Sequence, residues 1–352
     1  MFNFSPGPSM LPPAVLQTIQ RELLSCRGSG MSILEMSHRS DAFSEILEQA
    51  QADLRTLMDI PAQYQIFFMQ GGATAQFAAV PMNLGTPADY IDSGLFAHLA
   101  FTEAQKYGRV VCAGSSRADH YTHIPDYTPS PDARYVHITV NNTVYGTRFS
   151  RLPDTGNIPL AADLSSCILS EPFDVRRFGV IYAGAQKNAG AAGVTLAIVR
   201  KDLLGHALPI TPSVLDYTRL SDAGGLLNTP NCFGVYVCGL MFKWLLAQGG
   251  IPAMDVLSRE KSALVYEALD ENPLFQTHAR KADRSRVNIV FTTGSSALDE
   301  QFIKDAQQRG LFGLRGHRVL GGMRASLYNA MPLEGVRALA DFIRAFRAHC
   351  TI

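Results

Sequence analysis

A loop of glycine and alanine residues around a single lysine, set between two apolar runs, is the feature that most constrains the fold of this chain. The loop spans residues 183–193 and contains Lys187, and the apolar runs are 178–182 and 194–199. Both runs are short, rich in β-branched residues and bounded by turn residues, as buried strands are. A large flat group can lie against such a loop because few side chains cover its backbone. A desolvated lysine there becomes a better nucleophile, whereas an exposed lysine in a turn is the simpler alternative.

An aspartate at the end of an upstream strand is the second candidate group. Residues 158–166 predict a strand whose carboxyl end carries Asp163, followed by two serines. Ligands of open α/β sheets bind at the carboxyl ends of strands. Pyridoxal phosphate chemistry needs a lysine for the Schiff base and an acid beside the pyridinium nitrogen. Asp163 suits the second role, although an aspartate in this position is also a common cap or turn former.

A Gly-Gly turn supplies a candidate anion site. Residues 66–69 predict a strand, Gly71 and Gly72 a turn, and the alanine-rich segment that follows a helix. Backbone N–H groups at a helix N-terminus point at the ligand, and the helix dipole favours an anion. An ordinary tight turn is an equally good interpretation of these residues.

Alternating short strands and amphipathic helices predict an α/β fold with a mostly parallel sheet and helices on both faces. Strands are expected at 66–69, 89–92, 109–112 and 135–140, with helices at 14–26, 42–58, 74–83, 95–107, 232–248 and 253–269. A smaller α/β unit follows, with strand segments 287–291, 318–320 and 324–327 and helices 297–309 and 333–349. A chain of 352 residues is long enough for two domains. We expect a large domain over 13–255 and a small domain formed by 1–12 and 256–352.

Charge and composition exclude several classes of function. Thirty-one basic and 31 acidic residues leave no net charge, so nothing favours nucleic acid or an anionic membrane as a partner. The six cysteines are scattered and predict reduced thiols, and the N-terminus lacks the features of a signal peptide, so a cytoplasmic protein is expected. The apolar stretch 233–251 is interrupted by Lys243 and glycines, which predicts a buried helix. His120 and His123 lack a metal-binding context, so no metal is expected.

Three arginines stand in unusual surroundings. Arg39 and Arg318 each follow a histidine, His38 and His317, and Arg324 lies among glycine, methionine and alanine. A guanidinium binds a carboxylate or phosphate through two hydrogen bonds, and an adjacent imidazole adds a donor. A surface charge is the simpler interpretation for any one of them, but an unpaired charge in the apolar surroundings of Arg324 would be costly.

The lysine segment Gly184-Ala185-Gln186-Lys187-Asn188 resembles that of the phosphoserine aminotransferase family, which are fold-type-I, class V pyridoxal phosphate enzymes. The resemblance extends along nearly the whole chain, because many further segments match in order. These are 4–8, 37–39, 71–72, 76–81, 162–166, 227–230, 316–318, 321–326 and 328–335. It implies a large domain with a seven-stranded type of sheet, a smaller C-terminal α/β domain, pyridoxal phosphate as cofactor, and a homodimer with shared active sites.

The resemblance also assigns roles to individual residues. Lys187 would form the Schiff base and move the proton, and Asp163 would pair with the pyridinium nitrogen. The remaining cofactor contacts would come from Ala73, Thr74, Phe96, Thr143 and Gln186, together with Asn228 and Thr229 of the neighbouring subunit. Arg324 would bind the substrate α-carboxylate. His38, Arg39, His317 and Arg318 would surround the phosphate of phosphoserine or the side-chain carboxylate of glutamate.

The implied reaction converts 3-phosphohydroxypyruvate and glutamate into phosphoserine and 2-oxoglutarate in serine biosynthesis, and the same site could form 4-phosphohydroxy-L-threonine for pyridoxine biosynthesis. Two alternatives stay open: a class V aminotransferase with an unphosphorylated substrate, of the alanine–glyoxylate type, and a catalytically silent protein that binds pyridoxal phosphate. The chain departs from the well-known bacterial members at Phe96, where they have tryptophan. Phenylalanine can still stack on the ring, with less area and no N–H.

Overall fold

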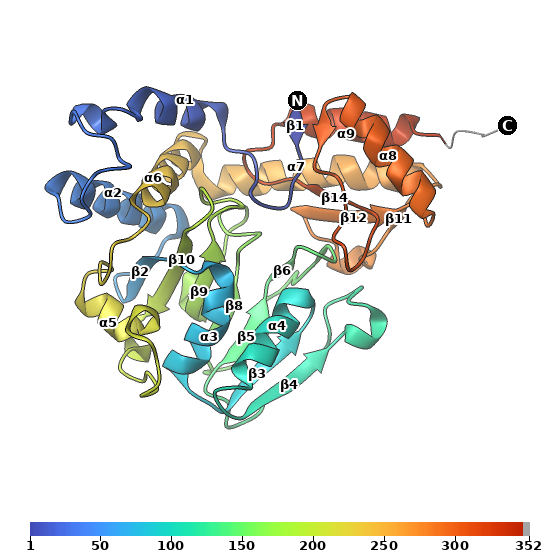
Figure 1. Ribbon diagram of the computed structural model, residues 1–352. Coiled ribbons are helices and arrows are strands. Elements are labelled where there is room, and N and C mark those ends of the chain that lie inside the picture. Colours follow the sequence, from blue (N-terminus) through green and yellow to red (C-terminus); the bar gives the residue numbers. More distant parts are fainter. Residues whose placement is uncertain (348–352) are drawn as a thin grey trace.

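A seven-stranded sheet forms the centre of the larger part of the molecule in this computed structural model, which describes residues 1–347 (Figure 1). The strand order is β2-β10-β9-β8-β5-β3-β4. Only β10 runs antiparallel to its two neighbours, so the predicted mostly parallel sheet is confirmed. The strands are β2 (Tyr64–Met69), β3 (Ala88–Asp92), β4 (Val110–Ser115), β5 (Val136–Thr139), β8 (Leu160–Asp163), β9 (Phe178–Gly184) and β10 (Thr195–Arg200).

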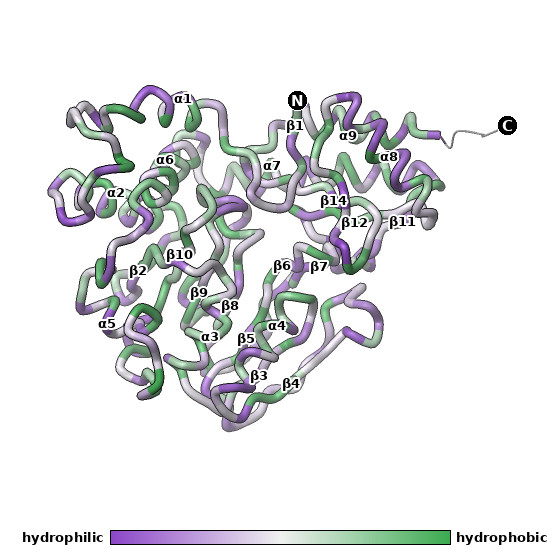
Figure 2. Tube along the Cα trace, in the orientation of Figure 1, coloured by the Kyte–Doolittle hydropathy of each residue, from purple (hydrophilic) through white to green (hydrophobic). Residues whose placement is uncertain are grey.

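Helices cover both faces of this sheet because alternate strand residues point to opposite faces and both sets are apolar. On one face, Ile138 and Ile181 belong to a core with helices α2 (Asp41–Met58) and α6 (Cys232–Ala247). On the other face, Val180 and Ala197 belong to a core with α3 (Gly72–Leu84) and α4 (Leu95–Ala104). Figure 2 shows hydrophobic residues along the central strands and α6. Two further helices, α1 (Pro13–Glu22) and α5 (Tyr217–Asp222), lie at the periphery.

A second hydrophobic core lies in the C-terminal part of the chain. Its sheet consists of β11 (Gln276–Thr277), β12 (Asn288–Thr292) and β14 (Met323–Ser326), packed with α8 (Ser296–Gln308) and α9 (Leu333–Ala345). The N-terminal strand β1 (Phe2–Asn3) pairs with β13 (Leu311–Phe312), and Phe4 is buried in this core. The long helix α7 (Gly250–Glu271) supplies residues to both cores. A division of the chain at residue 255 stays a prediction.

A short hairpin connects the two parts. Its strands are β6 (Asn141–Asn142) and β7 (Thr147–Arg148), directly after β5. The hairpin is buried throughout and reaches from the carboxyl end of the large sheet towards β12 (Figure 1). Gly146 has φ +72°, and a Cβ there would lie 3.0 Å from the Asn288 carbonyl oxygen, so only glycine fits this turn.

Several predicted element boundaries are wrong. Residues 318–320 form a turn, because the N–H groups of Leu320 and Gly321 both bond the His317 carbonyl. The helix predicted over 14–26 ends at Glu22, and the one predicted over 95–107 ends at Ala104. The last helix ends at Ala345, whereas the predicted end at 349, like Cys350, lies outside the described residues.

Within residues 1–347, no single helix is long and apolar enough to cross a membrane. Helices α6 and α7 pass that test only as a pair, with an 80° bend between them. The apolar stretch 233–251 includes this bend, and most of its α6 part is buried. The five described cysteines are free thiols.

Candidate active site

The lysine loop joins β9 to β10 at the carboxyl end of the sheet, and it is closed by its own backbone. Ala185 N–H bonds the Val194 carbonyl, and the N–H groups of Ala189 and Gly190 bond the Ala185 carbonyl. Gly190 is required for packing, since a Cβ there would lie 2.7 Å from the Cys238 sulfur. The loop is therefore an ordered turn that holds Lys187 in place over the end of the sheet.

The Lys187 amine lies in a defined environment. Its Nζ donates to the Thr143 hydroxyl at 2.7 Å and lies 5.6 Å from the centroid of the Phe96 ring. Burial lowers the pKa of Lys187 to about 8, and the positive charge of Arg324 adds to this shift while Asp163 opposes it. An amine with such a pKa is partly neutral at neutral pH and can act as nucleophile and base.

Asp163 ends β8 and is 5 % exposed. One carboxylate oxygen accepts from the Ser165 N–H at 2.8 Å, and the Ser165 hydroxyl in turn accepts from the Gly184 N–H at 3.0 Å. Burial raises the pKa of Asp163, against the effect of Lys187 and Ser165. A buried carboxylate without an arginine partner is suited to a cationic ring nitrogen.

The N-terminus of α3 is free to bind an anion. Gly71 is the cap residue with φ 92°, no side chain caps the helix, and its first turn contains no acidic residue. Ala73 and Thr74 follow in that turn, and Thr74 is exposed. Asn228 lines a cavity of about 350 Å³ together with Gly71, and the neighbouring Thr229 carbonyl accepts from Gln70 Nε2 at 3.2 Å. In a single chain these residues therefore lie near the α3 N-terminus.

Arg324 lies on β14, opposite the lysine loop. It is 5 % exposed, its Nη1 donates to the Thr143 carbonyl at 3.2 Å, and its buried Nε has no partner among residues 1–347. Burial lowers the pKa of Arg324. Thr143 thus contacts both the lysine, through its hydroxyl, and the arginine, through its carbonyl. An unsatisfied buried guanidinium N–H calls for an acceptor such as a carboxylate.

The turn at 316–322 brings His317 and Arg318 to the same wall. Gly316 N–H bonds the Gly322 carbonyl at 2.8 Å and closes the turn, and Leu320 packs on a cluster that contains Tyr121 and Tyr145. Burial lowers the pKa of His317, and the charges of Arg324 and Arg318 lower it further. No carboxylate in the described chain pairs with Arg318, so this wall carries uncompensated positive charge.

His38 and Arg39 are not brought to this wall within one chain. They lie in the turn before α2, where the Arg39 side chain is exposed. No hydrogen bond or ion pair between them and Lys187, Arg318 or Arg324 exists among the described residues. Gln186, by contrast, precedes Lys187 directly, and its carbonyl accepts from the Ser9 N–H at 3.0 Å.

The comparisons with known proteins agree with this geometry. The family model "Aminotransferase class-V" matches residues 1–339. A phosphoserine aminotransferase of Acidithiobacillus ferrooxidans is 50 % identical, and the match covers 98 % of each chain. The solved structure of the phosphoserine aminotransferase from Bacillus circulans subsp. alkalophilus is 41 % identical with TM-score 0.94, covering 97 % of this chain and 96 % of that one. A pyridoxal-phosphate-bound phosphoserine aminotransferase of Trichomonas vaginalis is 36 % identical with TM-score 0.93, covering 97 % and 99 %.

The chain belongs to the phosphoserine aminotransferase family. It is a pyridoxal-phosphate-dependent transaminase, as the resemblance of its motifs predicted. The residues present fit this cofactor: the lysine is partly neutral, the buried aspartate has no arginine partner within residues 1–347, and the first turn of the helix after Gly71 carries no acidic side chain. Among residues 1–347, no group of three or more acidic, histidine or cysteine side chains could hold a metal ion.

The N-terminal segment is a part of the site that the strand and helix patterns missed. Ser9 donates from its hydroxyl to the Lys187 carbonyl, and the Tyr328 hydroxyl donates to the Pro6 carbonyl at 2.7 Å. Gly7 has φ +138°, and a Cβ there would lie 3.3 Å from Lys187 Cγ. The only signal for this role was the match of residues 4–8 to the phosphoserine aminotransferase family, because irregular segments show no periodicity.

Proposed function

We propose that the protein transfers an amino group between O-phospho-L-serine and 2-oxoglutarate, with 3-phosphohydroxypyruvate and L-glutamate as the other pair. The observation that carries this proposal is that Arg318 and Arg324 lie close to His317, while no carboxylate among residues 1–347 pairs with either arginine. Such a wall favours a substrate with two anionic ends. The names of the relatives at 46–50 % identity support the same substrate.

The two anionic ends would be bound by different residues. The α-carboxylate is common to all amino-acid substrates, and Arg324, which lies closest to Thr143 and Lys187, suits it. The phosphate carries about two negative charges near neutral pH. His317 and Arg318 suit the phosphate, or the side-chain carboxylate of glutamate, because both belong to the turn 316–322 and are more exposed than Arg324.

The remaining roles concern the cofactor. When bound, pyridoxal phosphate supplies the electron sink that stabilises negative charge at the substrate Cα. Lys187 Nζ would take the Cα proton, and the Thr143 hydroxyl would orient that nitrogen. Asp163 would keep the ring nitrogen protonated, Phe96 would stack on the ring, and the phosphate would bind at Ala73 and Thr74, with Gln186 nearby.

A homodimer with shared sites would complete the pocket. Within the described part of the chain, the side chains of His38 and Arg39 form no hydrogen bond or ion pair with the residues of their own site. The nearby segment exposes Leu24, Met31 and Leu34, at 84 %, 45 % and 67 %. Exposed apolar residues in such number indicate a covered surface. We infer that a second copy covers this segment and receives His38 and Arg39 in its phosphate pocket, and Asn228 and Thr229 at its cofactor phosphate.

Mixed dimers test the shared site. Homodimers with Lys187→Ala, and homodimers with both Asn228→Ala and Thr229→Ala, should each have little activity. A heterodimer of the two contains one site without either lesion if the loop serves the neighbour. We expect purified heterodimers to regain up to half of the wild-type activity per site. Activity no higher than that of either parent would show that the loop serves its own subunit.

We also propose a second substrate and a cellular location, and the pocket disfavours the two alternative functions. A second activity with 4-phosphohydroxy-L-threonine follows from the same pocket, because this compound carries the same two anionic groups as phosphoserine. The scattered cysteines, expected to be reduced thiols, are the basis on which we propose a cytoplasmic location. A donor of the alanine–glyoxylate type has no anionic group for His317 and Arg318. A catalytically silent protein would not need the lysine pKa of about 8 next to a buried aspartate.

Donor specificity tests the proposed substrate. Loss of a desolvated charged partner costs roughly 2–4 kcal/mol, or about 30- to 1000-fold in kcat/KM. Arg318→Ala and Arg39→Ala should lose that much with phosphoserine and little with alanine, which has no distal anion. Arg324→Ala should impair all donors alike. Equal losses with every donor in Arg39→Ala and Arg318→Ala would refute the phosphorylated substrate.

A further inference from the structure

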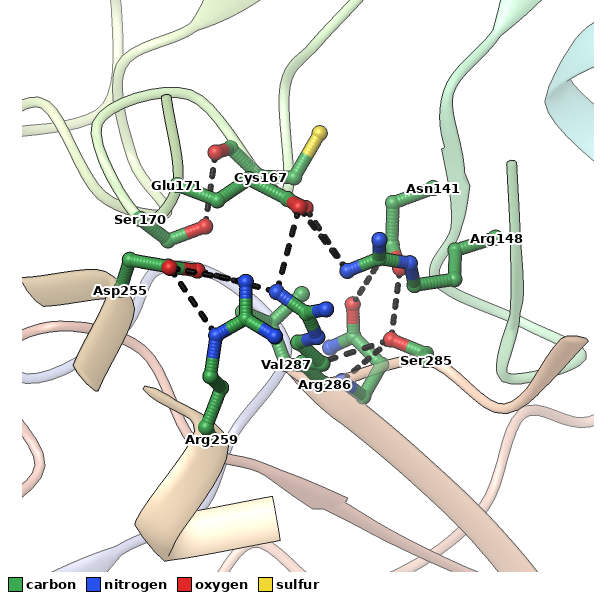
Figure 3. Close-up of polar contacts among 11 residues, drawn as sticks. Asn141, Arg148, Cys167, Ser170, Glu171, Asp255, Arg259, Ser285, Arg286 and Val287 are labelled. Atoms are coloured by element: carbon green, nitrogen blue, oxygen red, sulfur yellow. Dashed lines mark hydrogen bonds and ion pairs between the residues drawn. The ribbon is translucent and has the colours of Figure 1, made fainter. Parts of the chain in front are cut away.

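Two buried asparagines join the carboxyl end of the large sheet to the small core. Asn141 lies on the β6–β7 hairpin and is 3 % exposed, and Asn288 begins β12 and is fully buried. Asn141 Nδ2 donates to the Asn288 Oδ1 at 2.9 Å and to the Ser166 hydroxyl at 2.8 Å. Figure 3 shows Asn141 next to Ser285 in the seam between the two parts of the molecule.

The direction of every hydrogen bond in this network is determined. The Ser285 hydroxyl oxygen accepts from the N–H groups of Val287 and Asn288, so its proton goes to Asn141 Oδ1 at 2.6 Å. The Asn141 amide nitrogen must then face Asn288, whose own amide nitrogen donates to the Ser326 hydroxyl at 3.0 Å and the Tyr328 hydroxyl at 3.2 Å. Both side-chain amides use all their donors and their carbonyl oxygens, and a buried network satisfied in this way has one arrangement.

One end of the network is attached to the lysine loop. Asn188, the residue after Lys187, donates from its side chain to the Ser166 carbonyl at 3.1 Å, and Ser166 follows Asp163 by three positions. Asn141 itself is two residues before Thr143, which contacts the Lys187 amine. A shift of Asn141 would therefore move the hairpin that holds this amine.

The other end of the network is attached to the strand of Arg324. Asn288 pairs with Ser326 in the β12–β14 ladder, and Val290 pairs with Arg324. Side chains two apart on a strand point to the same face, so Ser326 and Arg324 face the hairpin together. The contact between Asn288 and Asn141 thus sets how far the Arg324 guanidinium lies from Thr143 and Lys187.

Resting on the proposed function of Arg324, we propose that Asn141 and Asn288 are positioning residues that hold the α-carboxylate-binding arginine at the correct distance from the lysine amine. Neither asparagine touches the substrate. Their loss would weaken the binding of every amino-acid donor to the same extent, whatever its side chain, because all donors share the α-carboxylate.

An ion-pair network in the same seam supplies a control. Arg286 bonds Asp255 at 2.9 Å and lies 3.6 Å from Glu171, while Arg148 bonds Glu171 and Arg259 bonds Asp255, each at 2.9 Å (Figure 3). These pairs also join the two parts of the molecule, and Arg148 is the ladder partner of Asn141 in the β6–β7 hairpin. Among residues 1–347, however, no hydrogen bond or ion pair links Asp255 or Arg286 to β14 or the lysine loop. Asp255→Ala removes the carboxylate partner of Arg286 and Arg259 and leaves every side-chain hydrogen bond of the two asparagines in place.

The test measures kcat/KM for phosphoserine, glutamate and alanine in cofactor-loaded Asn288→Ala, Asp255→Ala, Arg324→Ala and the double variant Asn288→Ala,Arg324→Ala. Asn288→Ala should lose about tenfold with all three donors, as coupled neighbours do, with unchanged cofactor absorbance. Asp255→Ala should melt at a lower temperature and keep kcat/KM within about twofold. The double variant should be no worse than Arg324→Ala alone.

Each contrary outcome has a separate meaning. Additive losses in the double variant, or an equal loss in Asp255→Ala, would overturn the positioning role and leave the proposed function intact. Unchanged kcat/KM in Arg324→Ala would overturn the role of Arg324 in the proposed function and the inference with it. Should Asn288→Ala fail to fold, Ser326→Ala replaces it, because this variant removes one acceptor of the Asn288 amide. Ser326→Ala and the double variant Ser326→Ala,Arg324→Ala are then compared in the same way, and a smaller loss of kcat/KM is expected. Additive losses in this double variant would again contradict the inference.

Discussion

Two lysines with a lowered pKa illustrate what distinguishes a reactive amine from a structural one. Lys187 lies in the loop between β9 and β10, and Lys261 lies on α7 and is 1 % exposed. Burial lowers the pKa of both, to about 8 for Lys187 and about 7 for Lys261. By this measure alone, the structural lysine would be the better nucleophile.

The partners of the two amines differ in kind. Lys261 Nζ donates to the Tyr328 and Asn329 backbone carbonyls at 3.1 and 3.3 Å. The same two residues contact the N-terminal segment, through the Tyr328 hydroxyl, and the lysine loop, through the Asn329 N–H. Lys187 Nζ has a hydroxyl partner, a buried aspartate in its field and an aromatic ring at 5.6 Å. A lowered pKa therefore indicates a catalytic group only where an acid partner and space for a ligand accompany it.

The largest expected difference between the two lysines is in turnover. Lys187→Ala should lose about 10⁴-fold or more in kcat, because the proton transfer and the covalent attachment of the cofactor both depend on this amine. Lys261→Met should keep most of its activity. Steady-state assays with phosphoserine, together with borohydride reduction and peptide mapping, compare them directly. A reduced cofactor adduct on Lys261 of the native protein would show that Lys261, and not Lys187, is the reactive lysine.

The acid partner should have the next largest effect. Asp163→Asn should slow a single turnover with glutamate about 10²- to 10³-fold, as loss of one preorganised electrostatic partner does, since the ring nitrogen loses its proton. Binding of the cofactor can persist through Lys187. Rapid-mixing absorbance measurements report the rate, and a rate near that of the wild type would make Asp163 a turn residue.

Lys261 should affect the free energy of unfolding, and its pH dependence, more than it affects activity. The unfolded chain keeps its lysine proton up to about pH 10.4, whereas folded Lys261 loses its proton near pH 7. Between these values the unfolded state binds more protons, so the stability of the wild type rises with pH by up to about 1.4 kcal/mol per pH unit. Urea unfolding of wild type and Lys261→Met at pH 6, 7, 8 and 9 tests this slope. A pH-independent difference between the two proteins would show that folded Lys261 keeps its proton.

The smallest expected effect concerns the hydroxyl partner of Lys187. Thr143→Val keeps the shape and the backbone carbonyl that Arg324 contacts, and removes a hydrogen bond worth about 1 kcal/mol. A loss of about fivefold in kcat/KM is expected with all donors. Thr139→Val, a buried threonine without a hydrogen-bond partner among residues 1–347, is the matched control and should change nothing. Equal activity in the two variants would remove Thr143 from the site.

Local patterns were sufficient to predict much of the fold and the position of several candidate site residues at strand ends. Lys187, Asp163 and the Gly71 turn follow strands, and the end of a strand in a parallel sheet has a known position. The turn at His317 was predicted as a strand because the apolar residues Val319 and Leu320 suggest one, whereas two N–H groups bonded to the His317 carbonyl form a turn. The Asn141–Asn288 contact joins residues 147 positions apart, and no local pattern contains such a pairing.

The most direct test of the proposed substrate is a titration of the purified, cofactor-loaded protein with O-phosphoserine, followed by cofactor absorbance and by release of the keto acid. The amino group should pass to the cofactor with one 3-phosphohydroxypyruvate released per subunit, and 2-oxoglutarate should restore the original spectrum. Glutamate should give the same change and alanine a far slower one. Rapid conversion by alanine without any response to phosphoserine would contradict the account and indicate an aminotransferase with an unphosphorylated substrate.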